Sequence, residues 1–587
     1  MKAHREITRL LWLAASASFF VAQASSPSPT PFQSRLDVRI PMRDGVELAA
    51  DVWMPSSDGS YPVILIRTPY LKSSSFARYP DMARFFAEHG YAFVVQDVRG
   101  TGDSDGEYRS FHQEAEDGYD TVEWIARRPW SDGRVGMMGA SYSGTVQWLA
   151  ARESPPHLTS LVSTAAWADP FEEGPYHQGV FNVLHSLTSN IVTSREIPRQ
   201  IDMAHVDWQR VLRHRPLLTM DEALGVRMPR YRQLLEHNTL DDYWKQIVFT
   251  DDHFKRISVP ALHLTGWFDV DQIGALVFWR GMAASSPAAD GQFLMIGPWE
   301  HGHIIYGGRE RIGEIALPRQ SVLDFDDFMR LHLQFFDHFM KEESDELDFP
   351  RVRIYVTGSD KWIDLDEYPP ANTVDRRLYL HSGGQANTLS GDGTLSWQPP
   401  AEEPADHFIF DPHEPITHMV GDVMHAFDNR SIEEQENVLV YTSDVVDEPL
   451  EIIGQVVVEL YAASDARDTD FVAKLLDVYP DGRAVNLGPF GKGFIRARYR
   501  NGYQQEELLT PNKPEIFKIK LFDIGHTFLR GHRIRVEITS SDAPYMAPNQ
   551  NTGNPVATDE EWRVARQTVL HTKEHPSSVV LPVVLND

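Results

Sequence analysis

The order of apolar and polar positions predicts that the first half of the chain is an α/β domain. Apolar and polar side chains alternate between residues 36 and 53 around an Asp-Gly pair, which predicts an antiparallel hairpin. Farther on, continuous apolar runs alternate with helix-like segments at 81–89 and 114–127, as in a parallel sheet covered on both faces. A long amphipathic helix is predicted at 323–341. The apolar runs lie at 61–70, 91–97, 134–140, 158–164, 260–265 and 292–296.

The strand pattern lapses in the middle of this domain. Aromatic, His, Arg and Leu residues recur there at helical intervals, as at 206–215 and 228–237. We therefore predict a helical cap at 168–255, inserted over the sheet where it can select substrates. The insertion divides the predicted α/β domain into 35–167 and 256–348.

The pattern changes again after residue 348. Short Val- and Ile-rich runs alternate with Gly, Pro and Asp turns and no helix-like segment separates them. This spacing predicts an all-β sandwich or jelly roll over residues 349–587. The predicted fold class is therefore α/β with an inserted helical cap, followed by a C-terminal all-β domain.

The N-terminus has the pattern of a secretory signal peptide. Three basic residues precede an apolar run at 10–21, and Ala-Gln-Ala follows it. The run is shorter than the stretch of about 20 apolar residues that a membrane-spanning helix needs. We predict a signal peptide at 1–24, cleaved after Ala24, and hence a periplasmic or secreted protein with no membrane contact after cleavage.

Composition restricts the possible chemistry and partners. The 587 residues include 84 acidic and 55 basic side chains, a formal net charge of −29. This charge argues against binding to nucleic acid or anionic membranes. The absence of cysteine rules out disulfides, thiolate catalysis and thiolate metal sites. We predict no cofactor and a small-molecule or short-peptide substrate, and leave open whether the protein forms a homo-oligomer.

A candidate nucleophile lies at the end of the apolar run 134–140. The segment 139–144 reads Gly-Ala-Ser-Tyr-Ser-Gly and leads into a helix-like stretch. A strand, a sharp turn with small residues and a helix form the context in which α/β-hydrolases expose a serine nucleophile, here Ser141. The second glycine usually lies two positions after the serine, whereas this chain has Ser143 there and Gly144 next. Glycine and serine before a helix often form only a turn and an N-cap, so the prediction needs partners.

Both partners of a catalytic triad follow predicted strands in the order serine, acid, histidine. Asp269 comes after the run 260–265, and His301 comes after the run 292–296. His301 would take the proton of Ser141, and Asp269 would orient the imidazole and stabilise its cation. His301 and His303 could instead be half of a metal site, but no companion pair has ligand spacing, so we predict no metal.

Three motifs together resemble the CocE/NonD serine hydrolases, a family that includes cocaine esterase, α-amino-acid ester hydrolases, cephalosporin acylases and related X-Pro dipeptidyl-peptidases. They are Gly-Ala-Ser-Tyr-Ser-Gly at 139–144, Gly-Trp-Phe-Asp at 266–269 and Gly-Pro-Trp-Glu-His at 297–301. The segments 530–536 and 540–544 also resemble the sandwich domain of that family, so the resemblance covers nearly the whole predicted mature chain. It implies an α/β-hydrolase core, a helical cap and a C-terminal jelly roll.

The resemblance also implies an oxyanion hole and a partial ammonium site. The backbone N–H of Tyr142 and the hydroxyl of Tyr70 would hold the oxyanion. The α-amino-acid ester hydrolases bind the substrate ammonium with carboxylates, partly two and three positions after the triad acid. Those positions are Asp271 and Gln272 here, so one carboxylate is retained, and Glu173 could supply another. A solvated acidic edge of the cap is the alternative.

The sequence therefore predicts an exported serine hydrolase that cleaves an ester or amide of a small acyl group, such as an α-amino acyl group, through an acyl-enzyme. X-Pro dipeptidyl-peptidase activity is the alternative within this class. A hypothesis from another class is a secreted carbohydrate- or peptide-binding protein whose hydrolase-like domain is inert.

Overall fold

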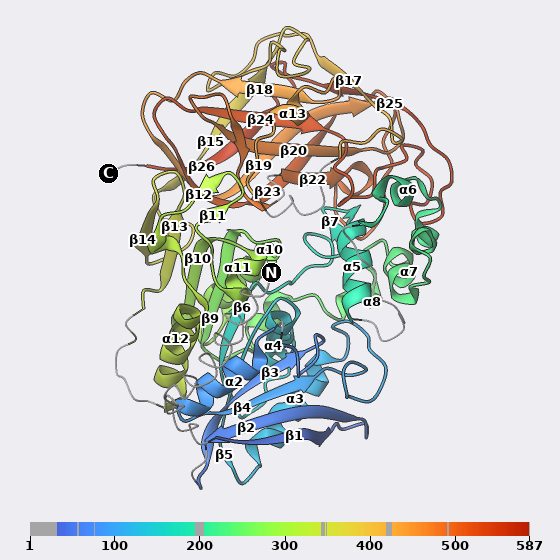
Figure 1. Cartoon of the computed structure of the whole chain (residues 1–587). Helices are drawn as coiled ribbons and strands as arrows, with labels where there is room; N and C mark the ends of the chain where they lie inside the picture. The colour runs from blue at the N-terminus through green and yellow to red at the C-terminus, as the bar shows by residue number, and fades with distance from the viewer. Residues whose placement is uncertain are drawn as a thin grey trace, which may run out of the picture.

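A computed structural model describes residues 32–585 except 56–57, 76, 194–204, 342–346, 348, 418–424 and 490–491. The predicted signal peptide lies outside the described residues. Figure 1 shows an α/β domain at one end of the molecule, a β-rich C-terminal domain at the other, and a helical cap between them at one side. No helix in the described ranges combines the length and apolar character needed to cross a membrane.

The α/β domain contains a ten-stranded sheet with the strand order β1-β2-β4-β3-β5-β6-β9-β10-β13-β14. The predicted antiparallel hairpin is formed by β1 and β2, and the strands from β4 through β3 to β13 pair in parallel. The strands are β1 (Phe32–Pro41), β2 (Glu47–Pro55), β3 (Tyr61–Thr68), β4 (Ala92–Asp97), β5 (Ser131–Ala140), β6 (Leu158–Thr164), β9 (Ala261–Phe268), β10 (Gln292–Glu300), β13 (Val352–Val356) and β14 (Lys361–Leu365).

Helices cover both faces of this sheet, as the continuous apolar runs predict. One apolar core contains Val122, Trp148 and Phe278 from α3, α4 and α10, and the other contains Phe86 and Phe335 from α2 and α12. The helices are α2 (Tyr79–Glu88), α3 (Glu114–Ala126), α4 (Tyr142–Arg152), α10 (Gln272–Ser285), α11 (His301–Tyr306) and α12 (Phe325–Phe336), which continues as a π-helical turn, η5 (Asp337–Lys341).

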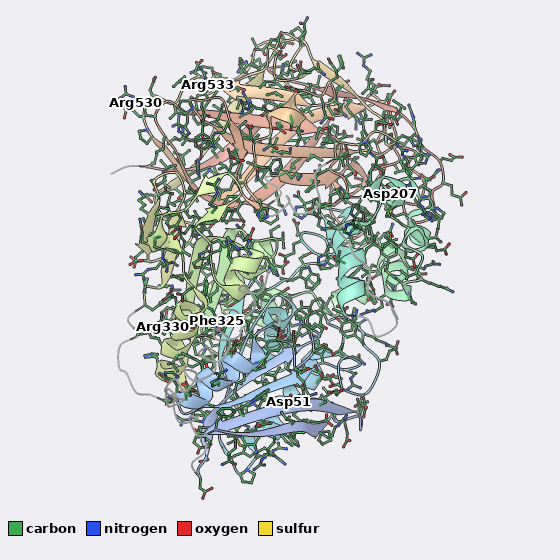
Figure 2. The ribbon with its side chains drawn as sticks, in the orientation of Figure 1. Asp51, Asp207, Phe325, Arg330, Arg530 and Arg533 are labelled. Carbon is green, nitrogen blue, oxygen red and sulfur yellow. The ribbon has the colours of Figure 1, made fainter. Side chains whose placement is uncertain are left out.

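The cap between β6 and β9 consists of short helices and a small hairpin. Its own apolar core includes Phe171, Tyr231 and Trp244. Asp207 caps the N-terminus of α6, and Figure 2 places it on the opposite side of the molecule from Arg330 of α12. The elements are β7 (Tyr176–His177), β8 (Val180–Phe181), α5 (Val183–Thr193), α6 (Trp208–Arg213), η2 (Leu217–Leu224), α7 (Pro229–Glu236), α8 (Asp242–Lys245) and α9 (Asp251–Phe254).

The C-terminal domain is β-rich and surrounds one large apolar core, which includes Leu460, Phe471 and Val536. The fold class predicted from the sequence is confirmed as an α/β domain followed by a β-rich domain, whereas the jelly-roll order of strands stays a prediction. Its elements are β15 (Thr373–His381), β16 (Thr394–Ser396), β17 (Asp406–Phe410), α13 (Arg430–Glu433), β18 (Leu439–Ser443), β19 (Leu450–Ser464), β20 (Asp470–Val478), β21 (Ala484–Asn486), β22 (Lys492–Arg496), β23 (Glu515–Phe528), β24 (Arg533–Thr539), β25 (Ala565–Val569) and β26 (Ser578–Val584).

The two strands that follow residue 349 differ from the sequence prediction. Both β13 and β14 extend the sheet of the α/β domain, with β13 parallel to β10 and β14 antiparallel to β13. The pattern placed residues 349–365 in the C-terminal domain, because a short strand at a sheet edge has no local feature that identifies its sheet. The boundary of the ten-stranded sheet therefore lies after Leu365.

The C-terminal domain braces the segment that follows β9. The Gln272 side chain accepts a hydrogen bond from the backbone N–H of Asp523 at 2.8 Å and donates one to its carbonyl at 3.0 Å. Arg280 on α10 forms an ion pair with the same Asp523 at 2.5 Å. Within the ten-stranded sheet, the Trp267 indole of β9 donates to the Tyr355 carbonyl of β13. These contacts fix the loop on which Asp269 and Asp271 lie.

Candidate active site

Ser141 lies in a strained turn between β5 and α4. Its backbone has φ 59° and ψ −127°, which a non-glycine residue rarely adopts. A Cβ atom on Gly139 would lie 2.6 Å from the Ser143 Cβ, and one on Gly144 would lie 2.6 Å from the Thr164 carbonyl oxygen. Small residues are therefore required on both sides of the turn, and Gly144 supplies the close approach to the neighbouring strand.

Asp269 and His301 are hydrogen-bonded to each other. They follow β9 and β10, two parallel neighbours in which Phe268 pairs with Glu300, so both side chains leave the same edge of the sheet. The His301 Nδ1 atom lies 2.8 Å from Asp269 Oδ1. An ionised carboxylate only accepts hydrogen bonds, so this contact places a proton on Nδ1 and leaves Nε2 of the neutral ring as a proton acceptor.

Asp269 is fully buried and held in place by two further donors. The Thr265 hydroxyl donates to its Oδ2 at 3.2 Å, and the backbone N–H of Asp271 donates to its Oδ1 at 3.0 Å. Although burial lowers the pKa of His301, the charge and hydrogen bond of Asp269 raise it to about 9. The protonated imidazole is therefore stabilised, as a histidine that accepts a proton requires.

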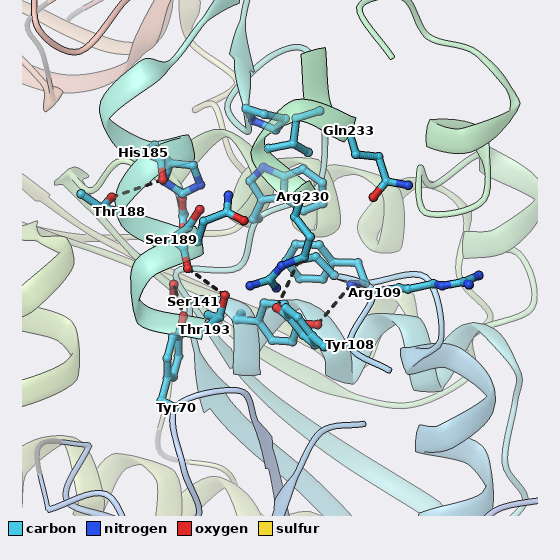
Figure 3. A pocket seen from close by; sticks show the side chains of 18 of the residues that line it. Tyr70, Tyr108, Arg109, Ser141, His185, Thr188, Ser189, Thr193, Arg230 and Gln233 are labelled. Carbon is cyan, nitrogen blue, oxygen red and sulfur yellow. Dashed lines mark hydrogen bonds between the residues drawn. The ribbon is translucent and has the colours of Figure 1, made fainter. Parts of the chain in front are cut away.

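Ser141, Tyr70 and His301 line one cavity of about 380 Å³. The Tyr70 hydroxyl lies 3.4 Å from Ser141 Oγ, as Figure 3 shows. No hydrogen bond between described atoms joins Ser141 to His301 in this structure. Catalytic hydrogen bonds are often long without substrate and shorten when it binds. The relation between Ser141 and His301 in this structure is therefore the cavity that both side chains line.

Tyr142 follows the serine and begins α4. The first backbone N–H groups of a helix have no acceptor within the helix, so the Tyr142 N–H can serve a substrate oxygen. Its side chain is fixed elsewhere, because the hydroxyl donates to Glu114 Oε1 at 2.8 Å and accepts from the Phe111 N–H at 3.1 Å. Arg67 forms an ion pair with the same Glu114 carboxylate at 2.8 Å.

The two carboxylates predicted to bind an ammonium lie in different surroundings. Asp271 lines the cavity, and its Oδ2 lies 3.9 Å from His301 Nδ1. Burial raises the pKa of Asp271 to about 7, partly opposed by the His301 cation. Its charge is therefore coupled to that of the histidine.

Glu173 is buried behind the cavity wall and does not line the cavity. Its carboxylate accepts hydrogen bonds from the backbone N–H groups of Ala168 at 2.8 Å and Gly274 at 2.6 Å. These bonds tie the start of the cap to α10, which is a structural role. Burial raises its pKa well above the ordinary value.

The cavity also contains residues that the sequence prediction did not include. The Phe111 ring stacks between Tyr142, with ring centres 4.2 Å apart, and Trp167, at 4.7 Å. His185 on α5 and Arg230 on α7 line the cavity from the cap. The helical pattern at 228–237 indicated a helix there, but no local signal showed which of its side chains would face Ser141.

The described residues contain no group of three or more His, Asp or Glu side chains arranged to hold a metal ion. His303, considered as a ligand in the sequence, instead lies 3.2 Å from Glu300. Burial lowers the pKa of His303 to about 4.

Comparison with known proteins agrees with this architecture. Residues 44–303 match the model of the X-Pro dipeptidyl-peptidase (S15) family, and residues 347–580 match that of the X-Pro dipeptidyl-peptidase C-terminal non-catalytic domain. The fold and these matches define the chain as a serine hydrolase of the α/β-hydrolase type.

A cocaine esterase from Rhodococcus sp. (strain MB1 Bresler) is 34% identical over 93% of this chain and 98% of its own length. The structure of an α-amino acid ester hydrolase superposes with a TM-score of 0.83 at 26% identity, covering 97% of this chain and 100% of the other. An aminopeptidase from a Thaumarchaeota archaeon of marine sediment has the same TM-score and identity, covering 96% and 99%. The chain belongs to the CocE/NonD family of serine hydrolases.

Proposed function

We propose that this serine hydrolase cleaves an ester or amide of a small acyl group with Ser141 as nucleophile, His301 as general base and Asp269 as the residue that orients His301. The observation that carries the proposal is the 2.8 Å contact between His301 and Asp269 at the wall of the cavity that Ser141 also lines. Three residues far apart in the sequence thus share one site.

The reaction begins when Ser141 Oγ attacks the carbonyl carbon and His301 Nε2 takes the hydroxyl proton. The negative charge that develops on the carbonyl oxygen is stabilised by the Tyr142 N–H and the Tyr70 hydroxyl. The C–O or C–N bond then breaks, and the His301 cation gives its proton to the leaving alcohol or amine. Water, activated by His301, hydrolyses the acyl-enzyme by the same steps.

We further propose that Asp271 receives the ammonium of an α-amino acyl substrate. Asp271 faces the cavity next to the nucleophile, and a charge-assisted hydrogen bond in this shielded site would orient the acyl group. Glu173 is not part of this proposal, because backbone donors already occupy its carboxylate. X-Pro dipeptidyl-peptidase activity is the second candidate, supported by the description of the matching family.

Two substrates separate these activities. An alanine ester should be hydrolysed faster than an Ala-Pro anilide if the protein is an acyl esterase, and the order should reverse if it is a dipeptidyl-peptidase. Failure to hydrolyse either would contradict both substrate assignments. Ser141→Ala and His301→Ala should each lower kcat by about 10⁴-fold or more, since triad members act as a unit.

The family assignment disfavours an inert binding protein, and the same variants test that alternative. If the wild-type protein hydrolyses esters slowly and Ser141→Ala does so at the same rate, binding without catalysis would be favoured.

We also propose that the protein is exported, which the signal-peptide pattern of residues 1–24 supports. N-terminal sequencing of the protein from its native host should then begin at Ser25, and recovery of an intact N-terminus from the cytoplasm would contradict export.

A further inference from the structure

Arg230 carries a charge that the described protein does not neutralise. Its side chain reaches from α7 into the cavity, as Figure 3 shows, and its guanidinium carbon lies 4.5 Å from the centre of the Tyr108 ring. The Nη2 atom is buried and has no hydrogen-bond partner among the described residues. No carboxylate of a described residue lies within ion-pair distance of the group.

Arg109, the other arginine among the described residues of the cavity wall, has different surroundings. Its side chain is 61% exposed, and its Nη2 forms an ion pair with Glu107 at 3.2 Å. Arg109 therefore has an anionic partner and contact with water. Of these two arginines, Arg230 is therefore the one whose charge is available to a molecule in the cavity, and Arg109 is a matched control.

A buried N–H group without an acceptor is destabilising, and an acceptor on a bound ligand would remove that penalty. The planar guanidinium fork matches a carboxylate, with which it can form two parallel hydrogen bonds. The aromatic rings beside it orient the fork but leave its charge in place. In a protein with a net charge of −29, a local cation is what allows an anionic group to enter.

We propose that Arg230 selects substrates that carry a carboxylate in addition to the bond that is cleaved. The inference rests on the proposed function, because Arg230 and Ser141 line the same cavity. Asp271 and Arg230 then give the cavity wall both an acidic and a basic side chain. The carboxylate can belong to the acyl group or to the leaving group, and these two sources require separate substrates.

Pairs of substrates that differ only in charge test each source. For the acyl group, the 4-nitrophenyl monoester of glutaric acid is compared with the 4-nitrophenyl ester of glutaric acid monoamide. For the leaving group, 4-acetoxybenzoate is compared with 4-acetoxybenzamide. The wild-type protein should prefer the anionic member in one pair, and the pair that shows the preference identifies the source.

Substitution of Arg230 should remove this preference. In Arg230→Gln, the ratio of kcat/KM for the anionic member to that for its neutral partner should fall by about 10- to 100-fold, as expected for loss of a charged hydrogen bond. Arg230→Lys keeps the charge but loses the fork, and the ratio should fall less. Arg109→Gln should leave the ratio near that of the wild type. The neutral substrate reports whether each variant is folded.

A binding measurement makes the test independent of turnover. Benzoate should bind the wild-type protein at least about tenfold more tightly than benzamide by calorimetry, and Arg230→Gln should abolish the difference. Equal binding of the two probes, or an unchanged difference in Arg230→Gln, would overturn the inference. If Ser141 does not react with a fluorophosphonate, the proposed function fails whatever the probes show. A reactive Ser141 without a carboxylate preference refutes the inference alone.

Discussion

The side chain of Tyr142 anchors the nucleophile turn through Glu114. The Tyr142 hydroxyl donates to Glu114 Oε1 at 2.8 Å, and Arg67 holds the same buried carboxylate at 2.8 Å. The backbone of Tyr142 adjoins Ser141, so a buried charged pair under the cavity fixes the position of the turn. The side chain of this residue therefore has a structural role that is separate from the proposed catalytic role of its N–H.

Tyr142→Phe should lower stability more than activity. The substitution leaves Glu114 Oε1 and the Phe111 N–H without their hydroxyl partner, which costs about 1–3 kcal/mol for a buried polar group. The backbone N–H is unchanged, so kcat should be largely retained. Denaturant unfolding and kinetics measure the two effects. Tyr379→Phe in β15, away from the site, is the control; an unchanged stability with a large loss of kcat would contradict the assignment.

Tyr70→Phe should lower activity more than stability. The Tyr70 hydroxyl lies 3.4 Å from Ser141 Oγ, and burial raises its pKa, so it stays a protonated donor over the working pH range. Loss of one oxyanion donor typically lowers kcat by about 10²–10³-fold. Steady-state kinetics with a neutral ester should show this loss with little change in the unfolding midpoint. A kcat close to that of the wild type would remove Tyr70 from the oxyanion hole.

Asp271→Asn should shift the pH profile to lower pH. A carboxylate beside His301 stabilises the imidazolium and raises the pKa of the histidine, which is about 9 with Asp269 and Asp271 present. His301 must be neutral to take a proton, so wild-type kcat/KM should still rise as the pH approaches 9. Removing the Asp271 charge lowers the pKa of His301, so the acidic limb of the kcat/KM profile should move to lower pH.

The pH dependence of kcat/KM for a neutral ester measures this shift. Asp290→Asn, at a fully exposed position, is the control and should leave the limb in place. A limb that does not move, or that moves to higher pH, in Asp271→Asn would show that Asp271 does not act on His301.

Gly144→Ala should disrupt the turn. The added Cβ would lie 2.6 Å from the Thr164 carbonyl oxygen, a backbone atom that cannot turn away. Overpacking of this kind destabilises by about 1–3 kcal/mol and displaces the adjoining serine. Gly302→Ala, where the new Cβ meets nothing within 4 Å, is the matched control next to His301. Equal stability and activity of the two variants would contradict the proposed need for glycine at 144.

Much of the site could be predicted because its residues follow strands. Continuous apolar runs identified β5, β9 and β10, and the carboxyl ends of parallel strands lie at one edge of a sheet. Asp269 and His301 could therefore be paired before their 2.8 Å contact was known. Ser141 and Tyr70 come just after β5 and β3, which end at the same edge of the sheet, so their positions could be predicted in the same way.

Other features depend on contacts between distant segments. Glu173 has the acidic character of an ammonium ligand, but its backbone partner Gly274 lies 101 positions away. Arg230 follows an ordinary helical pattern, and only the packing of the cap directs it over Tyr108. The sheet membership of β13 is likewise decided by pairing with β10 and not by its own sequence.

The central claim is that Ser141 is a nucleophile activated by His301, and a fluorophosphonate probe tests it most directly. Peptide mass spectrometry of the labelled wild-type protein should find one adduct per chain, on Ser141, and His301→Ala should slow its formation by at least about 100-fold, as expected for loss of the general base. An adduct on another residue, or labelling of Ser141→Ala at the wild-type rate, would contradict the mechanism.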